Sequence, residues 1–353
     1  MKIGLVGLPL VGKTTVFNLL TGRAEETASG KRKAHLASIK VPDARVERLA
    51  AIFQPKKTTH AEIEFVDLPG FEVGRGGLES ARLNEMRNLD ALVHVLRLFE
   101  SDAAPRHESC RGAEADARSL EQELILTDLV LVERRVERLR SDIGKGRKEL
   151  APELAVMERL RGLLEEETPL RAVELSEAEA ALLRGYQLVS RLPVILLANT
   201  GGAPDAGAMG ELGRLAETGG LGLVDMNAQA EWEIEQLPEG ERADFLADLG
   251  VSEPARDRFV RAGYDLLRLI SFFTVGEDEV RAWTIERGDT AVRAAGKVHS
   301  DMERGFIRAE VIACEEFFSL GSMAAARKAG ALRLEGRDYE VADGDILTIR
   351  FSV

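Results

Sequence analysis

The sequence predicts a doubly wound α/β protein that carries a helical insertion and a separate α+β module near its C-terminal end. Three observations predict this fold. A glycine-containing turn, residues 7–12, joins a short apolar run to a helical pattern. Two continuous apolar runs, 91–98 and 192–198, are of the kind that is buried on both faces of a parallel sheet. Short β-rich runs separated by Gly and Asp turns begin at residue 280.

The first elements alternate between strand and helix. Residues 2–6 form a β-rich run, residues 13–20 have helical spacing, and Thr21 and Gly22 close that helix. A second strand is expected at 61–66, where apolar and charged residues alternate up to Asp67. The third and fourth strands are the apolar runs named above. A strand, loop and helix followed by further buried strands is typical of a doubly wound core.

An insertion is expected at 112–188, because the interval from about 104 to 188 contains no convincing strand. Apolar residues recur there at steps of three and four, on both sides of an interruption at Gly144 and Gly146. They are Leu129, Val132, Val136, Leu139 and Ile143 before the interruption, and Leu150, Leu154, Met157 and Leu164 after it. Two apolar seams around a glycine turn predict an antiparallel helical hairpin, a short coiled coil.

The expected tip of this hairpin is basic. Between Glu133 and Lys148, seven Lys or Arg residues stand against three acidic ones. The basic residues are Arg134, Arg135, Arg138, Arg140, Lys145, Arg147 and Lys148, and the acidic ones are Glu133, Glu137 and Asp142. The tip is either a surface that binds an anionic partner or the solvated face of a coiled coil with ordinary mixed charges.

The C-terminal part has a different character. A helix is expected at 253–269, and the short runs that follow are expected to be strands. These runs are 280–285, 309–313, 332–334, 339–341 and 346–351. Five short strands with an intervening helix predict a β-grasp, ubiquitin-like shape. The expected domains are therefore 1–270, interrupted by the insertion, and 271–353.

Length and composition support several folded domains: the chain has 353 residues, of which 45% are hydrophobic and 30% charged. The longest apolar run is too short to cross a bilayer, and the first strand follows Met1 directly. We therefore expect a cytoplasmic protein with no membrane partner. Cys110 and Cys314 are too few for a disulfide framework, so reduced thiols are expected. The net charge of −13 argues against general binding to nucleic acid, so any RNA contact must be local.

The turn after the first strand carries the clearest chemistry. Residues 7–14 read Gly-Leu-Pro-Leu-Val-Gly-Lys-Thr, which is the phosphate-loop pattern in a strand-loop-helix context. In such a loop the backbone N–H groups wrap the β-phosphate, Lys13 reaches the β- and γ-phosphates, and the Thr14 hydroxyl binds Mg²⁺. The expected nucleotide-binding residues here are Leu8, Pro9, Leu10, Val11, Gly12, Lys13, Thr14 and Thr15.

A second motif follows the second strand. Asp67 and Gly70 stand where a P-loop GTPase places its second magnesium-side carboxylate and the glycine that senses the γ-phosphate. The next residue is Phe71, whereas Ras-like enzymes have a Gln that orients the attacking water, so slow hydrolysis is expected. His94 could be proposed as a replacement, but a histidine in the middle of an apolar strand is more often a core side chain.

The loop after the fourth strand is expected to lie near the base. GTPases have Asn-Lys-x-Asp there, and the Asp selects guanine, whereas this chain reads Asn-Thr-Gly-Gly from Asn199. The selecting carboxylate is absent, but Asn199 can brace the phosphate loop and contact the purine. Asn227 and Ala228 lie where a second base-side loop is expected.

Further segments resemble one family over nearly the whole chain. These segments are 4–9, 11–18, 64–67, 90–97, 99–100, 245–250, 279–284, 298–301, 305–313 and 338–345. On these residues the sequence resembles the YchF/Obg-like ATPases, a branch of the translation-factor-related P-loop GTPases. The resemblance implies a Ras-like G domain, an inserted coiled coil, a C-terminal TGS domain, ATP hydrolysis with Mg²⁺, and association with the ribosome. It also implies that an apolar residue belongs at Phe71.

Three positions depart from the family pattern. Gly202 replaces the Glu of the family's Asn-x-x-Glu base loop, so the resemblance alone favours ATP over GTP. The first-switch stretch, 27–39, lacks the Thr that reaches Mg²⁺, so weaker magnesium closure is expected. Leu10 replaces the Asn that assists potassium coordination in related GTPases, so no potassium activation is expected.

Two functions remain open from the sequence. The first is a nucleotide switch on the ribosome or RNA that hydrolyses ATP, or GTP, slowly. There Lys13 and Gly70 act on the phosphates, Thr14 and Asp67 hold Mg²⁺, and the hairpin tip and TGS domain contact the ribosome or RNA. The second is a non-catalytic nucleotide-binding scaffold that docks a ribosomal or protein partner. A monomer is expected in either case.

Overall fold

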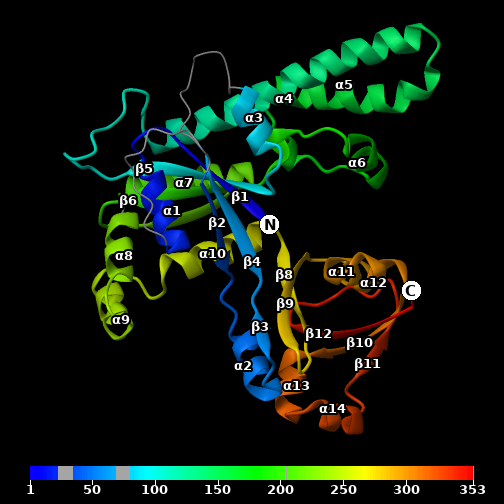
Figure 1. The fold of residues 1–353 in the computed structure, drawn as a ribbon. Coiled ribbons are helices and arrows are strands. Elements are labelled where there is room, and N and C mark those ends of the chain that lie inside the picture. The colour runs from blue at the N-terminus through cyan, green and yellow to red at the C-terminus, as the bar shows by residue number, and fades with distance from the viewer. Residues whose placement is uncertain (23–34, 69–79, 204, 353) are drawn as a thin grey trace. The chain divides into compact units, whose positions relative to one another are not determined.

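The computed structural model describes residues 1–22, 35–68, 80–203 and 205–352 (Figure 1). Its contacts divide the chain into two compact units. One unit comprises Met1–Ser38 and Glu64–Ala262, and the other comprises Ile39–Ile63 and Gly263–Val353. No helix among the described residues is long and apolar enough to cross a membrane.

The first unit contains the predicted doubly wound sheet. Its strand order is β2-β4-β1-β5-β6-β7, and the pairs from β4 to β7 are parallel. The strands are β1 (Lys2–Val6), β2 (His35–Lys40), β4 (Glu62–Asp67), β5 (Ala91–Leu98), β6 (Val194–Thr200) and β7 (Gly222–Met226). The side chains of β5 and β6 are almost all buried, so their apolar runs are the centre of the sheet as predicted.

The helices of this unit follow the strands in chain order. They are α1 (Lys13–Thr21), α3 (Ser80–Met86), α7 (Ala206–Gly219), α8 (Ala228–Glu235), α9 (Glu239–Asp248) and α10 (Ala255–Leu266). Strand β6 begins two residues later than predicted. Pro193 has no N–H to donate, and its carbonyl accepts from Leu92, so the regular ladder starts after it.

The insertion is a helical hairpin, as predicted. It contains α4 (Ala113–Gly144), the short η1 (Lys148–Leu150), α5 (Ala151–Glu165), η2 (Leu170–Ala172), α6 (Glu177–Leu183) and η3 (Val189–Arg191). Figure 1 shows α4 and α5 running side by side away from the sheet. Their facing apolar residues form one cluster that includes Val132, Val136, Met157 and Leu160, each at most 1% exposed. This buried seam makes the hairpin a packed element.

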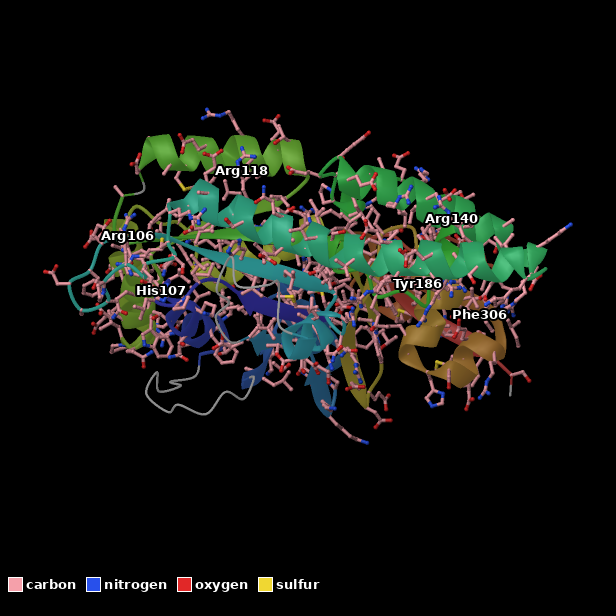
Figure 2. All side chains as sticks on the ribbon, turned by 90° about the horizontal axis from the view of Figure 1, so that it is seen from above. Arg106, His107, Arg118, Arg140, Tyr186 and Phe306 are labelled. Atoms are coloured by element: carbon pink, nitrogen blue, oxygen red, sulfur yellow. The ribbon has the colours of Figure 1, made fainter. Side chains whose placement is uncertain are left out.

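Polar contacts fix both the shaft and the root of the hairpin. Arg135 pairs with Glu153 at 2.7 Å across the two helices, and Arg140, which is labelled in Figure 2, pairs with Glu158 at 2.6 Å. At the root, the buried carboxylate of Asp128 accepts hydrogen bonds from the backbone N–H groups of residues 189 and 190, at 2.9 and 2.8 Å. Because those N–H groups lie a few residues before β6, this carboxylate ties the insertion to the sheet.

The second unit contains an α+β module with a mixed sheet of order β11-β10-β12-β8-β9-β3. The elements are α2 (Ala44–Phe53), β3 (Lys57–Thr59), β8 (Leu269–Thr274), β9 (Glu279–Glu286), α11 (Ala291–Val298), α12 (Ser300–Arg304), β10 (Phe306–Ala313), α13 (Cys314–Leu320), α14 (Met323–Ala329), β11 (Arg333–Glu335) and β12 (Asp345–Phe351). The five strands β8 to β12, with β8 parallel to β12 in the middle, have the predicted β-grasp arrangement, although β8 was not among the predicted strands.

One predicted strand of this unit is wrong. Residues 339–341 form only an isolated bridge, between Thr290 and Glu340. The Asp345 carboxylate accepts from the Tyr339 hydroxyl at 2.8 Å and from the Ala342 N–H at 2.9 Å. These bonds hold the segment as a turn that leads into β12, so it cannot extend along a neighbouring strand.

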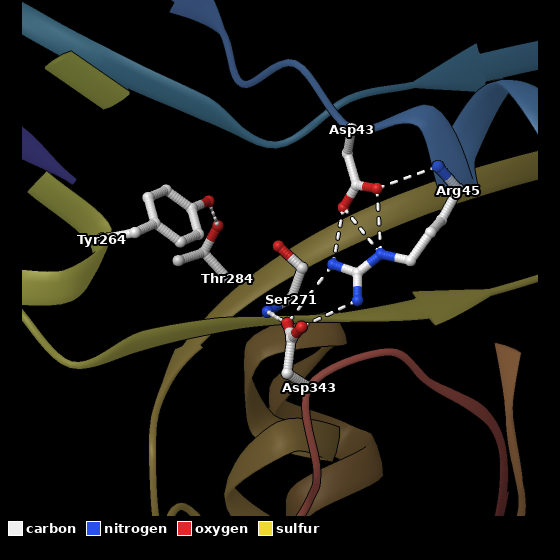
Figure 3. Close-up of polar contacts among 6 residues, drawn as sticks. All are labelled: Asp43, Arg45, Tyr264, Ser271, Thr284 and Asp343. Atoms are coloured by element: carbon white, nitrogen blue, oxygen red, sulfur yellow. Dashed lines mark hydrogen bonds and ion pairs between the residues drawn. The ribbon is translucent and has the colours of Figure 1, made fainter. Parts of the chain in front are cut away.

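The segment 39–63 belongs to the second unit, although about two hundred residues separate it from the rest of that unit in the chain. Strand β3 extends the sheet by pairing in parallel with β9, and Phe53 of α2 stacks on Phe317 with ring centroids 5.4 Å apart. The Arg45 guanidinium bonds both Asp43 and Asp343, each at 2.8 Å (Figure 3). We predicted a single boundary at 270/271, whereas these contacts assemble the unit from two separate stretches.

Candidate functional site

The phosphate loop joins β1 to α1. Gly12 caps α1 in the left-handed conformation, with φ of 91°, and Leu10 also has a positive φ, of 63°. The Lys13 ammonium turns back over the loop and donates to the carbonyls of Gly7 and Leu8, at 3.3 and 3.4 Å. The loop therefore presents a helix N-terminus and a lysine at one place, which is the arrangement that binds phosphate.

The sheet register places the second motif beside this loop. Leu5 of β1 pairs with Asp67 at the end of β4, so the carboxylate lies at the same sheet edge as the loop that follows β1. Thr14 stands in the first turn of α1. A hydroxyl and a carboxylate match the ligands that Mg²⁺ takes when phosphates and waters complete its shell. In the described part of the chain, no cluster of three or more His, Cys, Asp or Glu residues could hold a metal alone.

Asn199 braces the phosphate loop, as predicted. Its amide nitrogen donates to the carbonyl of Val11 at 3.0 Å, and its side chain is 4% exposed. A Cβ atom at Gly12 would lie 2.2 Å from that amide nitrogen, so only glycine fits where the loop passes Asn199. The end of β6 therefore holds the end of the loop directly.

The predicted base-side residues come together around Asn199. Its amide oxygen accepts from the N–H of Ala228 at 3.2 Å, and Asn227 caps α8 by accepting from Ala230 at 3.1 Å. Gly202 is exposed, and a Cβ atom there would meet no heavy atom within 4 Å. The structure thus joins Asn199 to the Asn227–Ala228 loop and leaves open space where the family's acidic residue would stand.

His94 lies in the core. It pairs in register with Val6 on β1, and it is 1% exposed. Burial, together with the nearby positive charge of Lys13, lowers the pKa of His94 to about 3. The imidazole is therefore neutral at physiological pH and too weak a base to activate water, in agreement with the core reading of the sequence.

Some predicted residues lie outside the described part of the chain. These are Gly70, Phe71 and the first-switch residues up to 34. Their predicted roles stay predictions.

The site also contains a residue that motif reasoning missed. Arg97, at the end of β5, is 3% exposed and donates to the carbonyl of Leu10 at 2.9 Å. Its only sequence signal is a charged residue near the end of an otherwise apolar, buried strand. Such a residue reaches the carboxyl edge of the sheet, where the loops of the site meet.

The fold and this site define a P-loop nucleotide-binding protein of the G-domain type. Residues 2–132 match a family model described as a 50S ribosome-binding GTPase. Residues 269–352 match the C-terminal domain model of the YchF GTPases, described as a protein of unknown function.

Individual relatives match over the whole length. The chain is 38% identical over 360 residues to the ribosome-binding ATPase YchF of Pasteurella multocida, covering 100% of this chain and 99% of that protein. It is 36% identical over 364 residues to the ribosome-binding ATPase YchF of Bacillus subtilis, with 100% of both covered. The structure of the Schizosaccharomyces pombe YchF GTPase is similar with a TM-score of 0.83, at 28% identity over 99% of this chain and 97% of that one. The chain belongs to the YchF family.

Proposed function

We propose that this protein is a nucleotide-dependent switch of the ribosome that binds and slowly hydrolyses ATP, with GTP as the second substrate. The observation that carries the proposal is the phosphate loop between β1 and α1, with Lys13 and Thr14 at the start of α1 and Asp67 at the adjoining end of β4. Relatives named ribosome-binding ATPases match this chain from end to end, which supports the ribosome as partner. Such a protein acts in the cytoplasm, where ribosomes are.

The residues have distinct proposed roles. Lys13 neutralises charge on the β- and γ-phosphates, Gly70 donates its N–H to the γ-phosphate, and Thr14 and Asp67 hold Mg²⁺. Mg²⁺ bound with the triphosphate supplies positive charge to the β- and γ-phosphate oxygens. Residues 8–15 wrap the phosphates, while Asn199, Asn227 and Ala228 line the base side.

Nucleotide preference is proposed to be weak. With Gly202 in the base loop, no side chain at that position accepts hydrogen bonds from guanine or distinguishes it from adenine. Selectivity then comes from the remaining backbone groups and stacking, which do not read the base edge strongly. We therefore expect ATP and GTP affinities within about tenfold of each other, a difference of about 1.4 kcal/mol.

Turnover with and without ribosomes tests the proposal. We expect slow ATP hydrolysis by the chain alone and faster hydrolysis with ribosomes, and a competition titration of ATP against GTP gives the preference. The scaffold alternative predicts nucleotide binding with a turnover, with or without ribosomes, indistinguishable from that of Lys13→Ala. That result would replace the switch by a fixed-ligand scaffold.

We further propose that the hairpin tip contacts ribosomal RNA, together with the C-terminal TGS domain. Of the seven basic tip residues, Arg135, Arg140 and Arg147 are neutralised by acidic neighbours. Arg134, Arg138, Lys145 and Lys148 are exposed and form no ion pair within the described residues. Four exposed, unpaired cations on a protein of net charge −13 form a local site for phosphates.

Reversing Arg134, Arg138 and Lys145 to Glu is expected to abolish co-sedimentation with ribosomes at low salt, because three attractive phosphate contacts become repulsive. The matched control reverses Arg184, Arg191 and Arg214, which are also exposed and form no ion pair within the described residues. The control carries the same total charge and should still pellet. Equal pelleting of the two variants would reject the tip as the ribosome-binding surface.

A further inference from the structure

A buried arginine supports the phosphate loop from the sheet. Arg97 of β5 and Asn199 of β6 are partners in the parallel register. Arg97 donates from Nη1 to the Leu10 carbonyl at 2.9 Å, and Asn199 donates to the Val11 carbonyl at 3.0 Å. Two neighbouring strands therefore hold two successive carbonyls of the phosphate loop.

The Arg97 contact falls on a strained residue of the loop. Leu10 has a φ of 63°, a backbone conformation that is unfavourable for a residue with a Cβ atom, and its side chain is 49% exposed. Packing of this side chain does not hold the conformation. The hydrogen bond from Arg97 to the Leu10 carbonyl does hold this backbone conformation. It thereby fixes the direction of the N–H groups that follow in the loop.

Arg97 lies near the exposed carboxylate of Glu100, whose own ion pair is with Arg106. No carboxylate forms an ion pair with Arg97 within the described residues, and its Nη2 is buried without a hydrogen-bond acceptor there. Its remaining contacts are the Phe99 carbonyl, 3.1 Å from Nε, and the Phe99 ring, whose centroid lies 4.1 Å from Cζ. A buried cation without an ion pair among the described residues is costly, and a bound anion would offset that cost.

We propose that Arg97 is a positioning residue for polyphosphate binding. It holds the loop in its phosphate-binding conformation through the Leu10 carbonyl, and the phosphates of the bound nucleotide are the anion that compensates its charge. The inference rests on the proposed function, because it takes a nucleoside triphosphate as the ligand. It adds Arg97 to Lys13 as a second cation in contact with the phosphate loop.

Two substitutions separate the geometry from the charge. Arg97→Met removes both, and we expect the affinity for ATP with magnesium to fall about 10- to 100-fold, the loss typical of a charged hydrogen bond. The loss should be larger for ATP than for ADP, because ATP carries more negative charge. Arg97→Lys keeps the charge and should bind ATP more tightly than Arg97→Met.

In steady state the KM of Arg97→Met should rise while kcat changes by less than about threefold, since Arg97 does not touch the reacting atoms.

The matched control is Arg171→Met, which removes another buried arginine. Arg171 pairs with Glu121 in the insertion, away from the loop. It should lower the Tm of the protein but leave ATP affinity unchanged. Equal ATP affinity of Arg97→Met and wild type would overturn the inference, and so would a similar affinity loss in Arg171→Met. Arg97→Lys binding no better than Arg97→Met would overturn the role of the charge. If the wild-type chain binds neither ATP nor GTP, the proposed function fails instead.

Discussion

Replacing Lys13 by alanine is expected to weaken binding of ATP with magnesium by at least about 100-fold, or about 2.7 kcal/mol. In the structure its ammonium group rests on the carbonyls of Gly7 and Leu8 at 3.3 and 3.4 Å, beyond the usual range of a strong hydrogen bond. Phosphate oxygens would give the same ammonium shorter, charge-assisted bonds. The substitution therefore removes these charge-assisted bonds from the nucleotide-bound state.

Isothermal titration with ATP and magnesium measures this effect, and urea unfolding of the free protein shows whether the variant is still folded. Lys2→Ala is the matched control. Lys2 is a half-exposed lysine of β1 that pairs with Glu64 at 3.6 Å, and it should leave ATP affinity unchanged. Wild-type affinity in Lys13→Ala would remove the phosphate loop from the proposed function.

The parts of the molecule that the sequence predicts well depend on local patterns. The core strands β1 and β5 lie where their apolar runs predict, and the hairpin turns at its glycines. Asn199 was predicted to brace the phosphate loop because a motif fixes its place after a buried strand. In each case, neighbouring residues in the sequence carry the signal.

The parts that the sequence does not predict depend on distant pairs. The contact of Arg97 with Leu10 spans 87 residues, and that of Arg45 with Asp343 spans 298 residues. Neither pair leaves a periodic or spacing signal. Strand β3 has only three residues, and its pairing partner is β9 in the other half of the chain. A motif scan cannot identify such contacts, because their partners are set by the folded topology.

A fragment of residues 263–353 is expected not to unfold cooperatively in urea when the segment 39–63 is absent. Its strand β9 would lose the pairing with β3 and leave a sheet edge open. Phe317, which is fully buried in the complete unit, would lose the stacked ring of Phe53. The Cζ atom of Arg48 also lies 4.0 Å from the ring centroid of Phe318, so the fragment would lose this cation–π contact as well.

Joining 39–63 to 263–353 through a Gly/Ser linker is expected to restore a cooperative unfolding transition. The joined segment supplies both the edge strand β3 and the side chains of Phe53 and Arg48 that pack on Phe317 and Phe318. Within this fusion, Arg45→Met should lower the free energy of unfolding by about 1 kcal/mol, since it breaks the bridge between Asp43 and the half-exposed Asp343. Lys56→Met is the matched control. It breaks only the exposed pair with Asp278 and should have almost no effect.

Equal stability of the fragment and the fusion would show that the C-terminal module is complete without 39–63. The expected difference matters for function because 39–63 connects β2 to β4, which ends at Asp67. The C-terminal end of the segment therefore continues into a strand whose last residue lies at the same sheet edge as the phosphate loop. If the module requires this segment to fold, any nucleotide-dependent movement of β2 or β4 acts on a part of the C-terminal module itself, without needing a separate contact surface.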